Sequence, residues 1–300
     1  MRKYLSKNEC RQRDGAASRK EQRYAPVLAK WLCLLALLFA VEAVRAQTYM
    51  EYVRQALEAL SMDSIDEAER WFREAMRVEP EQKSNAMIYY QIGQMYKYRG
   101  KNEKALEYYT LGLNTAPHNV ALRMARGGLY LLMGNLDYAL MDYSVVLEWK
   151  PNEPDALFMR AYIYTEKRLY REARTDYETL IKIQPDNEDA RIGLVLLNDK
   201  DNRPREAMDQ INAMLMAAPE HAILYAVRAG MEQSRKQYEA AEEDFSTAIT
   251  LDPRNIDFLL NRASLYIETK REKEARADLE KAMELGANPD DVATLRHELR

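Results

Sequence analysis

The chain has only two cysteines among its 300 residues, Cys10 and Cys33, and both precede residue 47. The remainder therefore has no thiol for a disulfide, a thiolate metal site or a cysteine nucleophile. Ten glycines and ten prolines are too few for a collagen-like or low-complexity chain. A hydrophobic content of 47% is too high for a disordered chain. The length suits one or two folded domains.

The main body of the chain lacks an excess of positive charge. Residues 1–46 contain 10 basic and 4 acidic residues, whereas residues 47–300 contain 34 basic and 44 acidic residues. An acidic body is a poor match for a phosphate backbone, so we expect no nucleic-acid partner.

Signatures of catalysis are also missing from the sequence. The three histidines, His118, His221 and His297, have no second ligand at a helical metal spacing. There is no glycine-rich phosphate loop, no Gly-x-Ser-x-Gly elbow and no His-Glu-x-x-His motif. We therefore predict that the chain is not an enzyme and has no metal site and no cofactor.

No apolar run is long enough to span a membrane. The longest, residues 31–41, has 11 residues, whereas a spanning helix needs about 20. It follows a basic stretch and precedes Ala46 at a small-residue end, which is the pattern of a secretory signal peptide. We predict a signal peptide over residues 1–46, with an uncleaved anchor as the alternative. In both cases the body is exported, to the periplasm or the cell surface.

Internal repetition dominates the rest of the sequence. Prolines recur at equal intervals after one slightly longer interval, at Pro80, Pro117, Pro151, Pro185, Pro219 and Pro253. Alanines recur in phase with them, at Ala68, Ala105, Ala139, Ala173, Ala207, Ala241 and Ala275. A bulky apolar residue stands four positions after each alanine, at Phe72, Tyr109, Tyr143, Tyr177, Ile211, Phe245 and Leu279. This spacing places the small and the large side chain on one helical face.

A period of about 34 residues fits two helices and a turn. The second copy shows the full set of markers, namely Ile92, Gly93, Tyr96, Gly100, Ala105, Tyr109 and Pro117. These markers resemble the tetratricopeptide repeat over most of the chain after residue 48. The resemblance implies an all-α, right-handed superhelical solenoid of seven helical hairpins. We expect repeats at about 49–82, 86–119, 120–153, 154–187, 188–221, 222–255 and 256–289, with a capping helix over 290–300 that completes the domain 47–300.

The repeats also contain a recurring pair of opposite charges. Four repeats carry arginine in the first helix and aspartate at one fixed place in the second, as Arg126 with Asp142, Arg160 with Asp176, Arg228 with Asp244 and Arg262 with Asp278. The other three repeats lack both residues. We predict that each pair is an ion pair that braces its hairpin, with two solvated charges as the alternative.

The resemblance implies that the first helices line an inner, concave wall. It places on this wall Tyr90, Gln94, Met124, Phe158, Tyr162 and Ile192, and the row continues through Leu196, Ala226 and Gly230. Some members of the family grip acidic peptide ends with lysine and asparagine there, and this chain lacks those residues at the matching places. An apolar wall suits a partner segment with hydrophobic anchors. The alternative is that these residues only pack neighbouring helices.

We therefore predict a non-enzymatic scaffold that binds a protein or peptide on its concave face. The alternative function is a glycan-binding or small-molecule-binding protein of the cell envelope, with tyrosines stacked on sugar rings. Self-association through the apolar wall is a further alternative.

Overall fold

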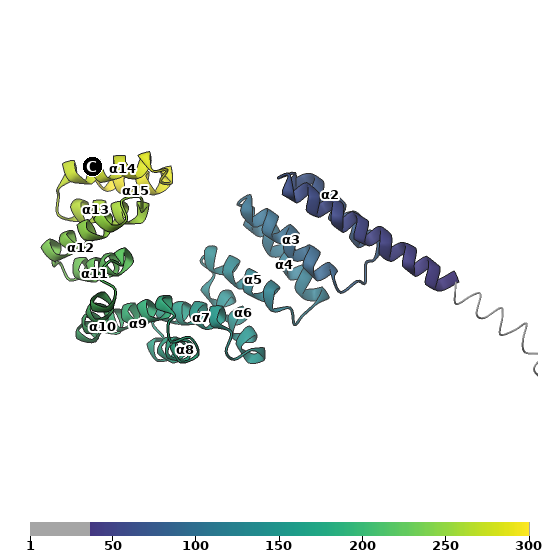
Figure 1. Ribbon diagram of the computed structural model, residues 1–300, viewed down its shortest axis with the longest axis horizontal. Coiled ribbons are helices and arrows are strands. Elements are labelled where there is room, and N and C mark those ends of the chain that lie inside the picture. The colour runs from purple at the N-terminus through teal and green to yellow at the C-terminus, as the bar shows by residue number, and fades with distance from the viewer. Residues whose placement is uncertain (1–36, 300) are drawn as a thin grey trace, which may run out of the picture. The chain divides into compact units, whose positions relative to one another are not determined.

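The computed structural model describes residues 37–299, and these residues are almost entirely helical (Figure 1). The predicted signal peptide lies mostly outside this range. The first helix covers residues 37–61 and therefore runs through the predicted cleavage position after Ala46. The helices that follow are α2 (Ile65–Val78), α3 (Asn85–Tyr98), α4 (Asn102–Thr115), α5 (Val120–Leu132), α6 (Leu136–Trp149), α7 (Pro154–Glu166), α8 (Tyr170–Ile183), α9 (Glu188–Lys200), α10 (Pro204–Ala217), α11 (Ala222–Ser234), α12 (Tyr238–Leu251), α13 (Ile256–Glu268), α14 (Glu272–Glu284) and α15 (Pro289–Glu298).

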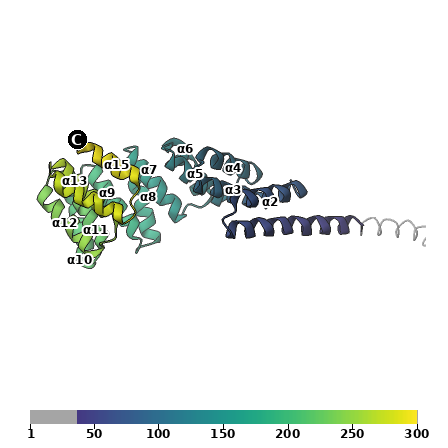
Figure 2. The same cartoon turned by 90° about the horizontal axis from the view of Figure 1, so that it is seen from above.

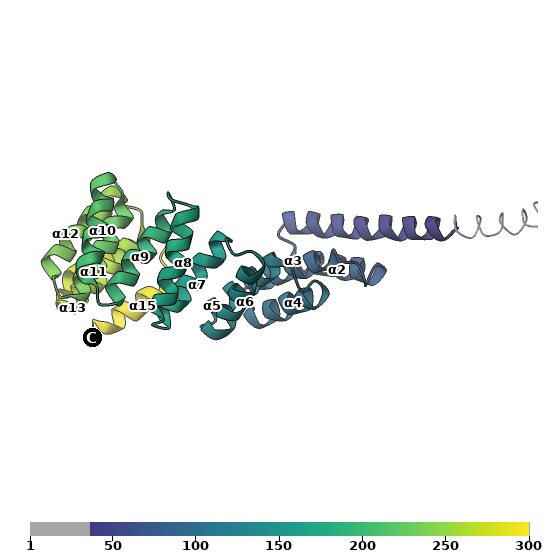
Figure 3. The ribbon, with the colours of Figure 1, turned by 90° about the horizontal axis from the view of Figure 1, so that it is seen from below.

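The chain divides within α5 into two compact units, one ending at Leu129 and the other beginning at Tyr130. In the C-terminal unit the hairpins α7–α8, α9–α10, α11–α12 and α13–α14 follow one another in chain order (Figures 2 and 3). The helix α15 packs on α13 and α14, where Val292 and Leu299 join the apolar cluster around Leu279. This is the position that a capping helix is expected to occupy.

The small and large residues of the repeat form the centre of each hairpin. All seven recurring alanines are fully buried, and the seven bulky residues that follow them are at most 3% exposed. A Cβ atom on Gly93 would lie 2.3 Å from Cε1 of Tyr109, so only glycine lets α3 approach α4 this closely. Side chains also fix where helices begin, since Asn187 and Asn255 accept backbone N–H bonds at the starts of α9 and α13.

The turn between the two helices of each repeat holds one residue in the left-handed region. In two repeats this residue is glycine, as Gly100 and Gly134, with φ of 68° and 74°. The equivalent residues of the other five repeats also have φ of 56–60°, namely Asp63, Arg168, Asn202, Lys236 and Lys270. The turn geometry is therefore common to all seven repeats, and five of them adopt it without glycine.

The two lysines in these turns offer a direct measure of backbone strain. A left-handed conformation costs an L-residue about 1 kcal/mol or more, and glycine recovers this at some cost in chain entropy. We expect Lys236→Gly and Lys270→Gly each to raise the free energy of unfolding by about 0.5–1 kcal/mol. Lys236→Ala keeps the strain and serves as the control. A denaturant titration in which both substitutions at Lys236 give the same stability would contradict this account.

Candidate functional site

The first helices of the C-terminal unit lie beside one another. Contacts join α7 to α9, α9 to α11 and α11 to α13. Among the described residues no comparable contacts join the second helices α8, α10, α12 and α14 to each other. The first helices are therefore drawn together on one side of this unit, where they form a continuous face. We call this the first-helix face.

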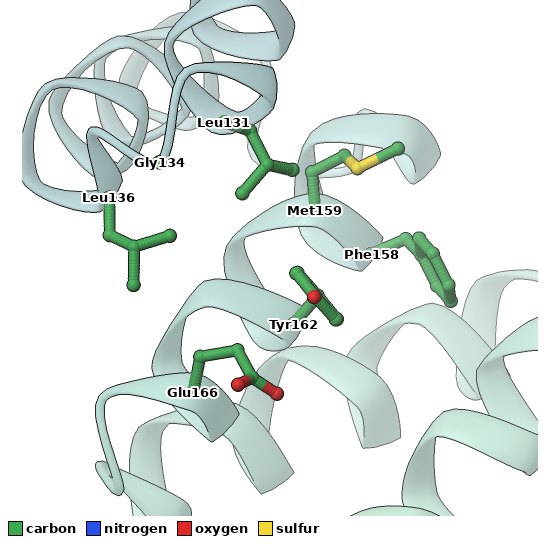
Figure 4. A pocket seen from close by; sticks show the side chains of 7 residues that line it. All are labelled: Leu131, Gly134, Leu136, Phe158, Met159, Tyr162 and Glu166. Carbon is green, nitrogen blue, oxygen red and sulfur yellow. The ribbon is translucent and has the colours of Figure 1, made fainter. Parts of the chain in front are cut away.

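An open cavity of about 550 Å³ lies at the start of this face (Figure 4). Figure 4 shows Phe158, Met159, Tyr162 and Glu166 of α7 on one side of it, with Leu131 and Leu136 on the other. Tyr162 is 43% exposed, and the ring of Phe158 meets Tyr177 edge-on at 6.0 Å. Two of the predicted site residues thus border an apolar space that a partner side chain can enter.

A second cavity, of about 360 Å³, lies further along the same face. It is lined mainly by α9, α11 and α13, with Leu196, Ile223, Ala226, Gly230 and Phe258 among its residues. The sequence row reaches Leu196, Ala226 and Gly230. It misses Ile223, which stands one turn before Ala226, and it misses Phe258, because the row ends at Gly230 in the sixth repeat. Ile192 does not line this cavity and instead packs against the cluster formed by Val195 and Ile211.

The other predicted site residues belong to the N-terminal unit. Gln94 donates to the hydroxyl of Tyr90 at 2.7 Å and accepts from the hydroxyl of Tyr109 at 3.0 Å. Met124 lies half-buried on α5. The structure therefore groups Tyr90 with Gln94, and it groups Phe158 with Tyr162. The six predicted residues thus fall into two sets, with Tyr90, Gln94 and Met124 in the N-terminal unit and Phe158, Tyr162 and Ile192 in the C-terminal unit.

Three of the arginine–aspartate pairs are bidentate ion pairs. The guanidinium of Arg160 donates to both oxygens of Asp176 at 2.7 and 2.8 Å, and Arg228 with Asp244 and Arg262 with Asp278 repeat this geometry. The aspartate side chains are only 5–9% exposed, so these are not solvated surface charges. Arg126 lies in the N-terminal unit, and the buried Asp142 lies in the C-terminal unit.

The arginines also make a contact that the sequence analysis missed. Arg228 donates to Asn212 of α10 at 2.7 Å, and Arg262 donates to Ser246 of α12 at 3.0 Å. Both partners belong to the repeat that precedes the arginine. Arg126 has the equivalent bond to Thr110, at 3.4 Å. Arg228 and Arg262 therefore join two successive repeats as well as the two helices of one hairpin.

The fifth repeat lacks the arginine–aspartate pair and has a cavity in its place. Leu194 and Gln210 replace the arginine and the aspartate, and both line an apolar cavity of about 200 Å³ between α8, α9 and α10. Gln210 accepts instead from the buried Asn198 at 2.8 Å. The shorter leucine does not fill the space that arginine fills in the neighbouring repeats.

Glu232 of α11 is a buried acid with a raised pKa. Its pKa is raised to about 7, first by burial and then by the charge of Asp244, against the lowering effect of Arg228 and Arg235. Its Oε2 has no hydrogen-bond partner. Four other repeats have tyrosine at this place, namely Tyr96, Tyr130, Tyr164 and Tyr266. The position is part of the repeat core, so we assign Glu232 a role in stability rather than in chemistry.

The described residues contain neither a metal cluster nor a membrane-spanning helix. Residues 37–299 hold no group of three histidine, cysteine, aspartate or glutamate side chains arranged for a metal ion. Within this range no helix combines the length and the apolar character that a membrane span requires. His221 lies 3.1 Å from Glu188, which is a pairwise surface contact.

Comparisons with known proteins agree with the repeat pattern. Residues 86–119 and 154–187 match one tetratricopeptide repeat model, and residues 233–299 match another. No curated protein sequence matches the chain. Among solved structures, a tetratricopeptide repeat protein from Parabacteroides merdae superposes with a TM-score of 0.76 at 24% identity, covering 84% of this chain and 99% of that one.

Two further structures are similar over long stretches. The APC/C hetero-tetramer Cut9–Hcn1 gives a TM-score of 0.54 at 13% identity, with 90% of this chain and 55% of that chain covered. The MamA protein gives 0.51 at 16% identity, with 65% and 97% covered. At these identities the likeness concerns the fold.

Proposed function

The chain is a tetratricopeptide repeat protein, and we propose that it binds a segment of a partner protein on its first-helix face. Proteins of this fold generally serve as non-enzymatic scaffolds for protein–protein interaction. The observation that carries the proposal is the open apolar cavity between Leu131, Phe158 and Tyr162. Partner anchors of this kind are apolar or aromatic side chains that enter such hollows.

We also propose that the protein is exported to the periplasm or the cell surface, after cleavage behind Ala46. The basic and apolar segment before this residue supports the proposal. Burial along the first helix is consistent with it, because residues 37–47 are all exposed and the first buried side chain is Tyr49. Cleavage would leave a helix over residues 47–61, which is close in length to the other helices of the repeats.

A crosslinking pull-down from the exported fraction of the native cells tests the binding proposal. The bait is the full chain, and its variant carries Phe158→Ser, Tyr162→Ser and Leu196→Ser, all on the first-helix face. A matched control carries Met141→Ser, Met216→Ser and Leu251→Ser, which remove exposed apolar side chains from the second helices α6, α10 and α12. Circular dichroism first establishes that all three baits are equally helical.

We expect a partner that the wild type and the control retain and that the first-helix variant loses. Equal retention by all three baits would place the binding site elsewhere and overturn the proposal. If no protein is retained but an oligosaccharide is, the alternative of a glycan-binding protein replaces it. Detection of the intact N-terminus on the exported protein would contradict the predicted cleavage.

A further inference from the structure

The first-helix face of the C-terminal unit combines an apolar floor with acidic edges. Exposed acids stand near the start of three of its helices, at Asp155, Asp189 and Asp257, and at the end of two, at Glu166 and Glu268. The two cavities lie between these ends. A segment seated on the floor therefore has carboxylates on both sides.

Basic side chains on the same helices are already engaged. The helices α7, α11 and α13 contain one basic residue each, Arg160, Arg228 and Arg262, and all three are paired with buried aspartates of the second helices. On α9, Lys200 Nζ lies 2.6 Å from a Glu166 oxygen, and Arg191 donates to the carbonyl of Pro185. Lys200 thereby neutralises Glu166, so the charge that this face offers to a partner comes from Asp155, Asp189, Asp257 and Glu268 and is negative.

Gly230 marks the floor of the second cavity. A Cβ atom built on Gly230 meets no neighbouring atom within 4 Å, whereas one on Gly193 would lie 2.5 Å from Tyr177. Glycine inside a helix costs about 1 kcal/mol relative to alanine. The packing of the described residues therefore does not require glycine at position 230. The missing side chain leaves the backbone of α11 exposed in the cavity, beside Leu196 and Ile223. A large apolar side chain of a partner has room there.

We propose that this face binds a segment in which apolar anchors alternate with lysine or arginine. The anchors fill the hollows beside Tyr162 and Gly230, and the cations face the acidic edges. Opposite charges at such a rim favour the correct partner and speed its association, and like charges exclude a wrong one. The inference rests on the proposed function and adds the chemistry of the partner. It predicts that acidic segments are rejected.

Three labelled 12-residue peptides test this proposal by fluorescence anisotropy with the full chain. The first alternates leucine and phenylalanine with lysine, the second has glutamate in place of lysine, and the third keeps lysine but has serine in place of the anchors. We expect the first peptide to bind at least 10-fold more tightly than either of the others. Its affinity should fall several-fold between about 50 and 300 mM salt, because exposed charges are screened.

Two variants assign the binding to this face. Gly230→Leu fills the second cavity with a residue of higher helix propensity, so we expect at least a 10-fold loss of affinity with no loss of thermal stability. Ala240→Leu adds similar bulk at an exposed position of α12 and is the matched control. A third variant combines Asp155→Asn, Asp189→Asn and Asp257→Asn. It should weaken binding of the lysine peptide several-fold and reduce the difference in affinity between the lysine and glutamate peptides.

The outcomes separate this inference from the proposed function. If the glutamate peptide binds as tightly as the lysine peptide and Gly230→Leu weakens both, binding to the first-helix face is supported. The proposed preference for a cationic partner is then wrong. If Gly230→Leu leaves the binding of the lysine peptide unchanged, the assignment to this face is overturned. If none of the peptides binds, the inference fails, whereas the pull-down still decides the proposed function.

Discussion

Replacing Asp176 by glutamine is expected to lower the free energy of unfolding by about 2–4 kcal/mol. The substitution leaves the guanidinium of Arg160 in a site where it is only 22% exposed and has lost two charge-assisted bonds. Breaking a fully buried ion pair costs about 3–5 kcal/mol, and the remaining access of water to Arg160 reduces this. The hydrogen bond to Asp176 raises the pKa of Arg160, and this effect is lost with Asp176. The guanidinium nevertheless stays charged, because its intrinsic pKa is far above the pH of the measurement.

The double variant Arg160→Leu, Asp176→Gln is expected to cost less than Asp176→Gln alone. It copies the pair that the fifth repeat uses, Leu194 with Gln210, and it leaves no orphaned charge. A hydrophobic replacement of both partners is often neutral for stability, although a cavity like that beside Leu194 has its own cost. The coupling energy of the cycle should therefore exceed about 1 kcal/mol.

Denaturant unfolding of the four proteins in the cycle measures this coupling, and hydrogen exchange on α7 and α8 shows where stability is lost. Lys281 and Glu284 form the control pair, because their side chains are 55% and 67% exposed. A surface pair of this kind is worth about 0.2–1 kcal/mol. If the two single substitutions at Arg160 and Asp176 add to the value of the double variant, the pair does not brace the hairpin.

The features that could be predicted from the sequence are those that recur within one repeat. Seven copies act as an internal alignment, so Ala173 and Tyr177 could be assigned to the core without any structure. The joint presence and absence of arginine and aspartate likewise pointed to contacts such as Arg160 with Asp176. Both features depend on short, constant separations within a single hairpin, where the regular repeat fixes the geometry.

The features that the sequence did not reveal depend on neighbouring repeats or on backbone shape. The bond from Arg228 to Asn212 crosses a repeat boundary, and its partner varies among threonine, asparagine and serine, so no single residue type marks it. The left-handed turn residues vary as well, from glycine to Lys236. The cavities arise where large side chains are missing, as at Gly230, and periodicity gives no measure of empty space.

A second large effect on the free energy of unfolding is expected at Glu232, because the ionised form of this side chain destabilises the fold. In the unfolded chain this carboxyl loses its proton near its usual pKa of 4.5, whereas in the fold burial raises the pKa to about 7. Between these values the folded state binds the extra proton, so stability falls as pH rises from about 4.5 to 7 and then stays low. At 1.36 kcal/mol for each pKa unit, the difference between these two values corresponds to about 3 kcal/mol, which is the upper end of the penalty of about 1–3 kcal/mol that we expect at pH 8.

Glu232→Gln removes this titration, so the variant should match the parent near pH 4 and exceed its stability by about 1–3 kcal/mol at pH 8. Glu232→Tyr should gain at least as much, because it restores the residue of four other repeats. There the guanidinium carbons of Arg160 and Arg262 lie 5.7 Å from the ring centres of Tyr164 and Tyr266. Glu280→Gln on the exposed side of α14 is the control and should leave the profile unchanged. Parallel pH profiles of Glu232→Gln and the parent in denaturant unfolding would show that Glu232 ionises equally in both states, and Arg228 would then have neutralised it in spite of its burial.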